Sequence, residues 1–307
     1  MTVKAEKTTK ILLGQGNNSL VMLFAINAIA FVVLKFIFVI YQMSDLNLDA
    51  FYSNIFKWFT LPAEIDKLGA RPWTLITSMF THESVWAVLP AMFWLWIFGY
   101  VLQDLTGNRR LIPIYIYGGI AGSVVYVISY YLIPLLQPAI PSAVFFGSNA
   151  AIMAVAVATT AVKPDYRFFP MINGGIPLWI VTLVFVVVDF ASVHLGDPGR
   201  YLAHLAGGAT GFIFVYQLRK GRDWSVGMNS LFDWFNDLFN PDKKIKINPA
   251  KDEFFYKVHG SHPYKRIPNV TQKRIDEILD KINLEGYHLL TDEEKDILRR
   301  ASSADEL

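Results

Sequence analysis

The sequence predicts an all-α polytopic membrane protein, because its composition is apolar and it contains six long apolar segments. Apolar residues make up 53% of the 307 residues and charged residues only 18%, whereas soluble globular proteins carry roughly 25% charge. The mean hydropathy is +0.33. This composition excludes a fully soluble protein, and the small formal net charge of +2 argues against nucleic acid as a partner.

The sequence has no cysteine, which excludes disulfides, thiolate nucleophiles, and Cys-ligated zinc or iron–sulfur clusters. His259 and His262 have no acidic or Cys companions at ligand spacing. We therefore expect neither a cofactor nor a bound metal.

Six segments are candidates for membrane-spanning helices, because about 20 apolar residues cross roughly 30 Å of hydrocarbon. They lie near residues 20–41, 85–102, 111–136, 146–162, 176–194 and 201–218. The first follows a polar tail, residues 1–19, and is longer than the roughly 7–15-residue apolar core of a signal peptide. We therefore expect it to be retained, and the predicted membrane domain covers residues 20–218 as a six-helix transmembrane bundle.

Basic residues gather on one side of the predicted spans, and cytoplasmic loops tend to carry Lys and Arg. With the N-terminus inside, the inner segments hold Lys4, Lys7, Lys10, Arg109, Arg110, Lys163, Arg167, Arg219, Lys220 and Arg222. We therefore expect both termini to be cytoplasmic, in a multi-pass protein of an inner or plasma membrane.

Two features predict the packing of the membrane domain. Gly118 and Gly122 are four residues apart, as are Gly207 and Gly211, and small residues at this spacing let helix backbones approach. The loop over residues 42–83 is rich in aromatic side chains. We expect it to form short helices that lie in the outer membrane interface.

Beyond the last span the chain becomes polar. Residues 219–269 have the proline and glycine content of a linker, with a short surface helix over 230–239. Residues 270–307 predict a small cytoplasmic helical hairpin, in which Thr291 and Glu294 form a capping box. Because a hairpin of this size has a small core, we expect it to dock on a cytoplasmic partner or on the membrane domain of the same chain.

The few polar residues inside the spans are the candidates for chemistry, because such groups are costly in a membrane. His204 lies about four residues into the sixth span, roughly 6 Å deep at 1.5 Å per residue. Ser148 and Asn149 open the fourth span from the same side. A hydroxyl, an amide and an imidazole are thus expected at similar depth, while Asp189 near the end of the fifth span is expected to face water or a partner.

Several motifs together resemble those of rhomboid proteins over roughly residues 71–218. They are Trp73, His82, Trp94-Leu95-Trp96-Ile97-Phe98-Gly99, Gly118-Gly119-Ile120-Ala121-Gly122 and Ala203-His204-Leu205-Ala206-Gly207-Gly208-Ala209-Thr210-Gly211. Rhomboids are intramembrane serine proteases in which a Ser at the start of the fourth span is the nucleophile and a His in the sixth span is the base. The resemblance implies a rhomboid-like bundle with His204 at the position of the base.

The sequence departs from the rhomboid pattern at the nucleophile. The family motif is Gly-x-Ser-Gly-Ala, and alignment on Gly147 places Asn149 at the nucleophile position and Ser148 one residue before it. The amide nitrogen of Asn cannot act as a serine-type nucleophile, because its lone pair is delocalised.

The sequence also departs at the oxyanion positions, which in active members often read His-x-x-x-Asn in the second span. Counted from His82, these positions are Ala87 and Ala91, whose side chains offer no donor. The usual Trp-Arg of the first loop is Trp73-Thr74. Loss of one oxyanion donor can lower the rate by about 10²–10³-fold.

Two functions remain open. These departures favour a pseudoprotease that binds or regulates transmembrane-helix proteins in the lipid bilayer without cutting them. The alternative is intramembrane proteolysis of transmembrane substrates by a Ser148/His204 dyad, with backbone N–H groups as oxyanion donors. Since one residue is about 100° on a helix, that dyad requires a change of register. A channel or carrier is disfavoured, because the spans lack the broken helices of such proteins.

Overall fold

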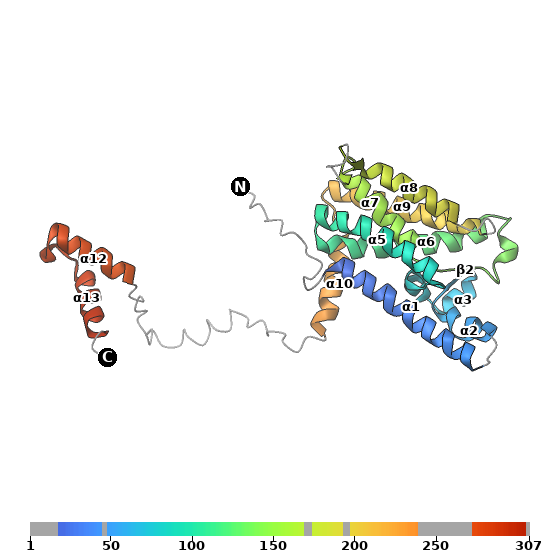
Figure 1. The fold of residues 1–307 in the computed structure, drawn as a ribbon, viewed down its shortest axis with the longest axis horizontal. Helices are drawn as coiled ribbons and strands as arrows, with labels where there is room; N and C mark the ends of the chain where they lie inside the picture. The colour runs from blue at the N-terminus through green and yellow to red at the C-terminus, as the bar shows by residue number, and fades with distance from the viewer. Residues whose placement is uncertain (1–17, 45–47, 169–173, 193–196, 239–271, 305–307) are drawn as a thin grey trace, which may run out of the picture. The chain divides into compact units, whose positions relative to one another are not determined.

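The structure is a computed structural model that describes residues 18–44, 48–168, 174–192, 197–238 and 272–304. It contains two compact units, Met1–Asn240 and Pro241–Leu307 (Figure 1). Most of the predicted polar N-terminal tail and of the predicted linker, and both His259 and His262, lie outside the described residues.

The first unit is a bundle of long helices joined by short helices and by two antiparallel strand pairs. The long helices are α1 (Ser19–Met43), α5 (Val85–Thr106), α6 (Leu111–Leu132), α7 (Asn149–Val162), α8 (Leu178–Ser192), α9 (Pro198–Arg219) and α10 (Ser225–Leu238). The short helices are α2 (Leu48–Asn54), η1 (Phe56–Trp58), α3 (Ile65–Ala70), α4 (Thr74–Thr77), η2 (Ser78–Phe80), η3 (Asn108–Arg110) and η4 (Gln137–Ala139). The strand pairs are β1 (Leu61–Pro62) with β2 (Val144–Phe145), and β3 (Arg167–Phe168) with β4 (Ile176–Pro177). This architecture confirms the predicted all-α class.

Local residues determine where α1 begins and where α6 ends. The Asn18 side chain accepts hydrogen bonds from two backbone N–H groups of the first turn of α1, which is the usual role of Asn at a helix start. At the end of α6, Ile133 precedes Pro134 and is extended, because a residue before proline disfavours the helical conformation. Helix α6 therefore ends at Leu132, before the predicted end of the span near residue 136.

Helix α9 begins earlier than the sequence analysis predicted. Pro198 occupies its first turn, where the fixed φ angle and missing N–H of proline are well tolerated. His204 is therefore the seventh residue of α9. At 1.5 Å per residue, it lies about 9 Å from the start of the helix, compared with about 6 Å from the predicted start.

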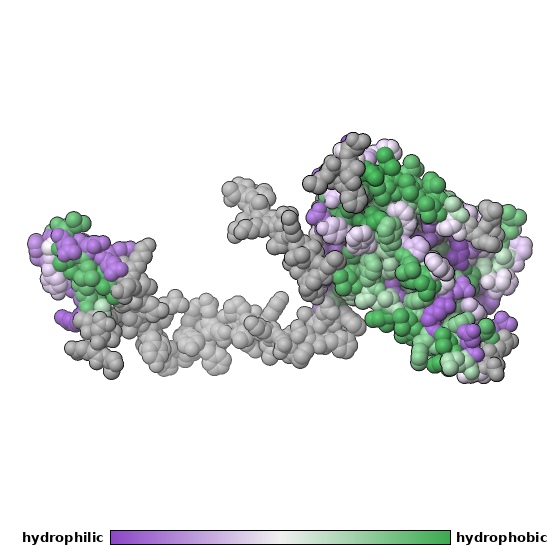
Figure 2. Space-filling model, in the orientation of Figure 1, coloured by the Kyte–Doolittle hydropathy of each residue, from purple (hydrophilic) through white to green (hydrophobic). Residues whose placement is uncertain are grey.

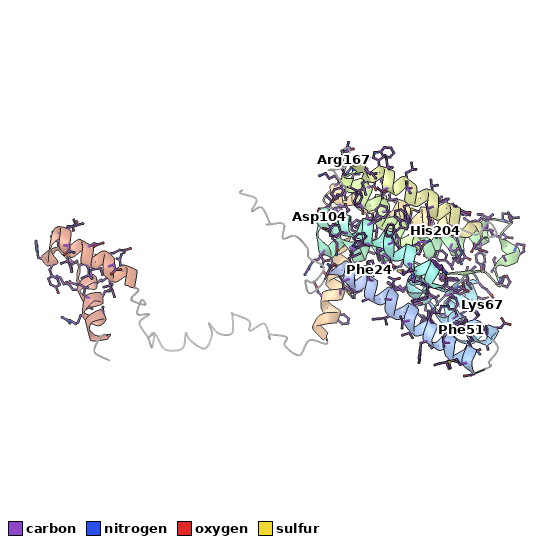
Figure 3. All side chains as sticks on the ribbon, in the orientation of Figure 1. Phe24, Phe51, Lys67, Asp104, Arg167 and His204 are labelled. Carbon is purple, nitrogen blue, oxygen red and sulfur yellow. The ribbon has the colours of Figure 1, made fainter. Side chains whose placement is uncertain are left out.

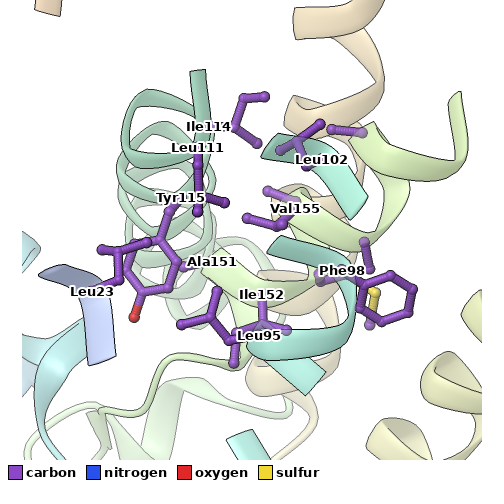
Figure 4. Packing of buried hydrophobic residues seen from close by; sticks show 14 of the residues in the cluster. Leu23, Leu95, Phe98, Leu102, Leu111, Ile114, Tyr115, Ala151, Ile152 and Val155 are labelled. Atoms are coloured by element: carbon purple, nitrogen blue, oxygen red, sulfur yellow. The ribbon is translucent and has the colours of Figure 1, made fainter. Parts of the chain in front are cut away.

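Helix α7 is the central element of the bundle and contacts α5, α6 and α9. Its residues from Ala150 to Ala156 are all buried. Figure 4 shows the residues that pack at this centre, among them Ala151, Ile152, Val155, Leu95, Phe98 and Tyr115. With 14 residues, α7 is about 21 Å long, shorter than the roughly 30 Å of hydrocarbon. Because other helices enclose it, packing rather than bilayer thickness sets its length.

Small residues bring α6, α7 and α9 close together. A Cβ at Gly207 would lie closer than 3.0 Å to the carbonyl oxygen of Ala150, and a Cβ at Gly211 would do the same to that of Ala154. On α6, a Cβ at Gly118 would overlap the Cβ of Ala154. The predicted role of these glycines in helix packing is confirmed.

Three helical segments of the described chain are long and apolar enough to cross a membrane. They are Ser19–Met43, Val85–Thr106 and Asn108–Leu132, and α7 and α8 are shorter apolar helices. Large apolar side chains are exposed on these segments, such as Phe36 and Trp86, and Figure 2 shows apolar residues over much of the surface of this unit. Such surfaces fit a lipid environment, so the chain is an integral membrane protein.

The segment between α1 and α5 forms short helices, as predicted, and is tied to the start of α7. In the β1–β2 pair, Leu61 is opposite Phe145. The backbone N–H of Gly147 donates to the carbonyl oxygen of Ser78 over 2.9 Å. These contacts fix the turn that presents Ser148 and Asn149.

The second unit is a helical hairpin made of α12 (Gln272–Glu285), η5 (Tyr287–Leu289) and α13 (Asp292–Ala304). The backbone N–H of Thr291 donates to Glu294 Oε2 over 2.9 Å, and the N–H of Glu294 donates to Thr291 Oγ1 over 3.3 Å. The predicted capping box is thereby confirmed. Ile278 and Leu290 are buried and form a core as small as the length predicts.

Candidate functional site

A cavity of about 670 Å³ lies between α5 and α8. Its walls come from the end of the loop before α5, the first half of α5, the start of α7, the end of α8 and the start of α9. The residues are Thr81, His82, Glu83, Ser84, Trp86, Ala87, Pro90, Ala91, Trp94, Phe146, Gly147, Asn149, Phe185, Val188, Asp189, Ser192, Asp197, Arg200 and His204. The cavity is in the size range of ligand sites in proteins, about 300–1,000 Å³.

Three polar side chains meet in the wall of this cavity. Asn149 Nδ2 donates to Asp189 Oδ1 over 2.9 Å, and His204 Nδ1 is 2.6 Å from Asp189 Oδ2. Asp189 and His204 are both buried, and Figure 3 labels His204 among the helices of the first unit. Because His204 contacts Asp189 through Nδ1, its Nε2 is left for any other contact.

The structure corrects the expectation that Asp189 faces water or a partner. Its side chain is 1% exposed and uses both oxygens inside the protein. The physical reason is that α8 packs beside α7 and turns this carboxylate inward, where Asn149 and His204 satisfy it. One signal for this role is visible in the sequence, because an ionisable residue near the end of a span needs a partner.

Ser148 lies one residue before Asn149 and points elsewhere. Its side chain is fully buried, and its Oγ completes no hydrogen bond. Its hydroxyl lies near that of Tyr115 on α6. The structure describes no hydrogen bond between Ser148 and His204. Because one residue rotates the side chain by about 100° on a helix, Asn149 rather than Ser148 faces the cavity.

Ala87 and Ala91 also line the cavity, on the same face of α5 as each other. These are the positions where the family pattern carries oxyanion donors. Both side chains are methyl groups, so this part of the wall is apolar and supplies no hydrogen bond to a developing oxyanion.

The side chain of His82, which lines the cavity, hydrogen-bonds to Asn27 of α1 and not to Asn149, Asp189 or His204. Its Nε2 is 3.0 Å from Asn27 Oδ1, and Asn27 Nδ2 donates to the carbonyl oxygen of Leu23 and to the hydroxyl of Tyr115. His82 lies outside the spanning helices, and burial lowers its pKa from 6.5 to about 4. It is therefore neutral at pH 7 and links the loop before α5 to α1.

We expect His82 to make the stability of the protein depend on pH. Because its pKa is lower in the folded than in the unfolded chain, the stability is complete above pH 6.5 and decreases as the pH falls toward 4. A difference of this size corresponds to about 3 kcal/mol. Thermal melting of the detergent-purified protein between pH 7.5 and 4, compared with that of His82→Gln, measures this effect. Parallel profiles for the two proteins would contradict it.

An ion pair braces the entrance of the cavity. Arg200 Nε donates to Asp197 Oδ2 over 2.8 Å, and the Arg200 guanidinium donates to the carbonyl oxygens of Val144 and Phe146. Tyr130 donates to the other oxygen of Asp197. The sequence analysis did not identify this pair, which joins the start of α9 to the strand before α7.

Among the described residues, no group of three or more His, Asp or Glu side chains could hold a metal ion.

The class of protein follows from this arrangement. An integral membrane bundle brings His204, near the start of α9, against Asp189, near the end of α8. The pair lies beside the first turn of α7 and in the wall of a cavity between α5 and α8, so the fold is that of a helical membrane protein with a polar cavity.

Comparison with known proteins identifies the family. Residues 69–221 match the Rhomboid domain, and residues 264–304 match a family of unknown function, DUF6576. The chain belongs to the rhomboid family. It is similar to RHOMBOID-like protein 12, mitochondrial, from Arabidopsis thaliana, with 25% identity over 163 residues. This match covers 50% of the chain and 48% of that protein, so the chain spans about half the length of the relative.

Proposed function

We propose that this protein is a proteolytically inactive rhomboid-like membrane protein that binds or regulates transmembrane partners. The observation that carries this proposal is the hydrogen bond from Asn149 to Asp189. At the position of the nucleophile, the chain has an unreactive amide that is held by a carboxylate. The carboxylate also holds His204, so the three groups stabilise one another.

The rest of the cavity supports the same proposal. Hydrolysis of a peptide bond needs a nucleophile and donors for the oxyanion. Ser148 is buried on the side of Tyr115, and Ala87 and Ala91 replace the donors in the wall. Each missing donor lowers the rate by about 10²–10³-fold, so the losses accumulate.

Binding of a transmembrane segment is supported by the shape and the surface of the bundle. The cavity opens between α5 and α8, whose outward sides carry large exposed apolar residues such as Trp86, Phe93 and Val187. A partner helix in the bilayer would meet an apolar surface first and then the polar pair of Asp189 and His204. In a membrane, such buried polar groups provide interhelical hydrogen bonds.

The hairpin is proposed to recruit a cytoplasmic partner. Its own core is small, and several large apolar side chains remain exposed, with Leu284 at 85%, Tyr287 at 59% and Leu289 at 57%. Three such residues within six positions are a candidate contact surface.

Fluorophosphonate labelling tests the inactivity. We expect no labelling of the purified protein under conditions where a known active rhomboid is labelled, because no serine among the described residues hydrogen-bonds to His204. Ser148→Ala and His204→Ala are expected to leave this background unchanged. In Asn149→Ser the hydroxyl would face His204, so any labelling gained in that variant supports the assignment of position 149.

The alternative function, cleavage of transmembrane substrates by a Ser148/His204 dyad, makes the opposite prediction. Labelling of the wild type that disappears in both Ser148→Ala and His204→Ala would establish an atypical protease. It would require the start of α7 to change register, since Ser148 faces Tyr115 in this structure.

We further propose that both termini are on the cytoplasmic side of an inner or plasma membrane. The start of α1, the turn at η3 and the helix α10 lie at one end of the bundle, since Ser19 bonds to Asn108 and Asn229 bonds to Arg109. Arg109 and Arg110 are at this end, and cytoplasmic segments carry such residues.

Single cysteines measure the orientation directly, because the chain has none of its own. We expect Lys163→Cys to be labelled by a membrane-impermeant maleimide only after the cells are opened. Asp66→Cys, in α3 at the other end, is expected to be labelled in intact cells. The reverse pattern would invert the proposed orientation.

A further inference from the structure

A second hollow lies on the outside of the bundle, away from the cavity between α5 and α8. It is an apolar groove of about 700 Å³ between α6, α9 and α10. The lining residues are Tyr117, Ile120, Ala121, Val124, Val125, Thr210, Trp224 and Gly227. Thr210 does not offer a free hydroxyl, because it donates to the carbonyl oxygen of Ala206 within α9. The groove therefore fits an apolar occupant.

The groove extends over only part of the thickness of the bundle. Helix α6 begins at Leu111, at the end where α10 packs. The lining residues of α6 run from Tyr117 to Val125, which corresponds to depths of about 9 to 21 Å along the helix. Half of the hydrocarbon thickness is about 15 Å. The lining residues of α6 extend over only about 12 Å, which suits one acyl chain, whereas a spanning helix would need a groove along the full length.

Helix α10 closes the groove at the membrane surface. The hydroxyl of Tyr117 donates to the carbonyl oxygen of Trp224, just before α10, and the Trp224 ring meets Phe214 of α9 edge-on. Figure 1 shows α10 crossing the direction of α1 rather than running along it. Its exposed apolar residues include Leu231 and Trp234, at 62% and 60% exposure. A helix with these properties lies in the membrane interface.

Two basic side chains without carboxylate partners lie in the short segment between α9 and Trp224. Lys220 and Arg222 follow the end of α9 and precede Trp224, and both are exposed. Among the described residues, Lys220 contacts only the ring of Tyr216, and the guanidinium of Arg222 forms no ion pair. The nearest carboxylate in sequence, Asp223, is already bonded to Arg110 over 3.0 Å. Two exposed cations therefore lie within four residues of Trp224, which lines the groove.

We propose that this groove is a binding site for an anionic phospholipid of the leaflet on the side of α10. One acyl chain lies along α6 and α9 beneath Trp224, and the headgroup phosphate is bound by Lys220 and Arg222. The site is separate from the Asn149, Asp189 and His204 cluster, so it does not depend on whether the protein cleaves peptides.

Native mass spectrometry of the full-length protein in detergent tests this site, with phosphatidylglycerol and phosphatidylcholine of identical acyl chains as probes. We expect one lipid adduct to form preferentially with phosphatidylglycerol. Each Lys or Arg near an anionic lipid contributes about fivefold in affinity, so two cations give a preference of roughly 25-fold. The double variant Lys220→Gln/Arg222→Gln is expected to bind both lipids equally.

The groove itself is tested by filling it. Ala121→Phe is expected to weaken binding of both lipids by at least about tenfold, which corresponds to roughly two CH₂ groups no longer buried. Val187→Phe, which enlarges an exposed apolar position on α8, and Lys163→Gln, which removes an exposed cation outside the groove, are the matched controls and should leave binding unchanged. Size-exclusion profiles identify any variant that has lost its fold.

Three outcomes would overturn the proposal. Adducts that form equally with phosphatidylglycerol and phosphatidylcholine would contradict a headgroup site at Lys220 and Arg222. Adducts that persist in Ala121→Phe would show that the lipid binds outside the groove. The mass of a dimer, or of another polypeptide, that disappears in Ala121→Phe would assign the groove to a protein partner instead of a lipid.

Discussion

Gly211→Ala is expected to lower the free energy of unfolding by about 3 kcal/mol, at the upper end of the usual cost of overpacking. The new methyl group would overlap the carbonyl oxygen of Ala154 on α7. This oxygen belongs to the backbone of the central helix and cannot move aside as a flexible side chain can. Helices α7 and α9 would have to separate, and the start of α9, with His204, would move with them.

Gly69→Ala is the matched control for this substitution. Gly69 lies in α3 and has nothing within 4 Å of the position where a Cβ would be, so alanine there is expected to be neutral or to stabilise the helix by up to about 1 kcal/mol. Thermal or denaturant unfolding in detergent measures both variants. Equal stability of Gly211→Ala and Gly69→Ala would show that α7 and α9 are not in close contact.

Asp189→Ala is expected to cost about 3 kcal/mol as well, by a different mechanism. The carboxylate contacts Asn149 and His204, and its removal leaves the half-buried Asn149 and the buried His204 without this partner. Each unsatisfied buried group costs roughly 1–3 kcal/mol. Asn149→Ala removes only one of the two bonds and is expected to cost about 1 kcal/mol.

Asp165→Ala provides the comparison for Asp189→Ala, because Asp165 is exposed in the turn after α7. Surface substitutions of this kind usually change stability by less than about 0.5 kcal/mol. If both aspartate variants unfold alike, the hydrogen bonds of Asp189 contribute nothing and the argument for a locked site fails. A second measurement is the ¹⁵N chemical shift of His204, which should change in Asp189→Ala and not in Asp165→Ala.

Much of the fold could be predicted because its causes are local in sequence. Long apolar segments predict helices in a membrane whatever their neighbours are, and the class is confirmed. The capping box of Thr291 and Glu294 depends on residues three apart, and it forms as predicted. The predicted ends of the helices were less accurate than the predicted fold class. The early start of α9 depends on Pro198, which the apolar pattern does not include.

The sequence analysis singled out His204 and Asn149 but did not predict Asp189 as the residue that joins them. The motif around His204 and the departure at Asn149 are visible in the sequence. Asp189, which joins them, is 40 residues from Asn149 and 15 from His204. No local pattern links residues at such separations, since they meet only through the packing of α8 beside α7 and α9.

The sequence by itself determined that this protein is a helical membrane protein of the rhomboid type, and it predicts Asn149 at the position of the nucleophile. Hydrophobicity, helix spacing and residue chemistry are properties of short segments and can be evaluated from them. Only the tertiary structure decided which way Ser148 and Asn149 point, that Asp189 is buried between two partners, and that α10 closes an apolar groove. Each of these depends on the rotation of a helix about its axis, about 100° per residue, and close packing between segments far apart in the chain fixes that rotation.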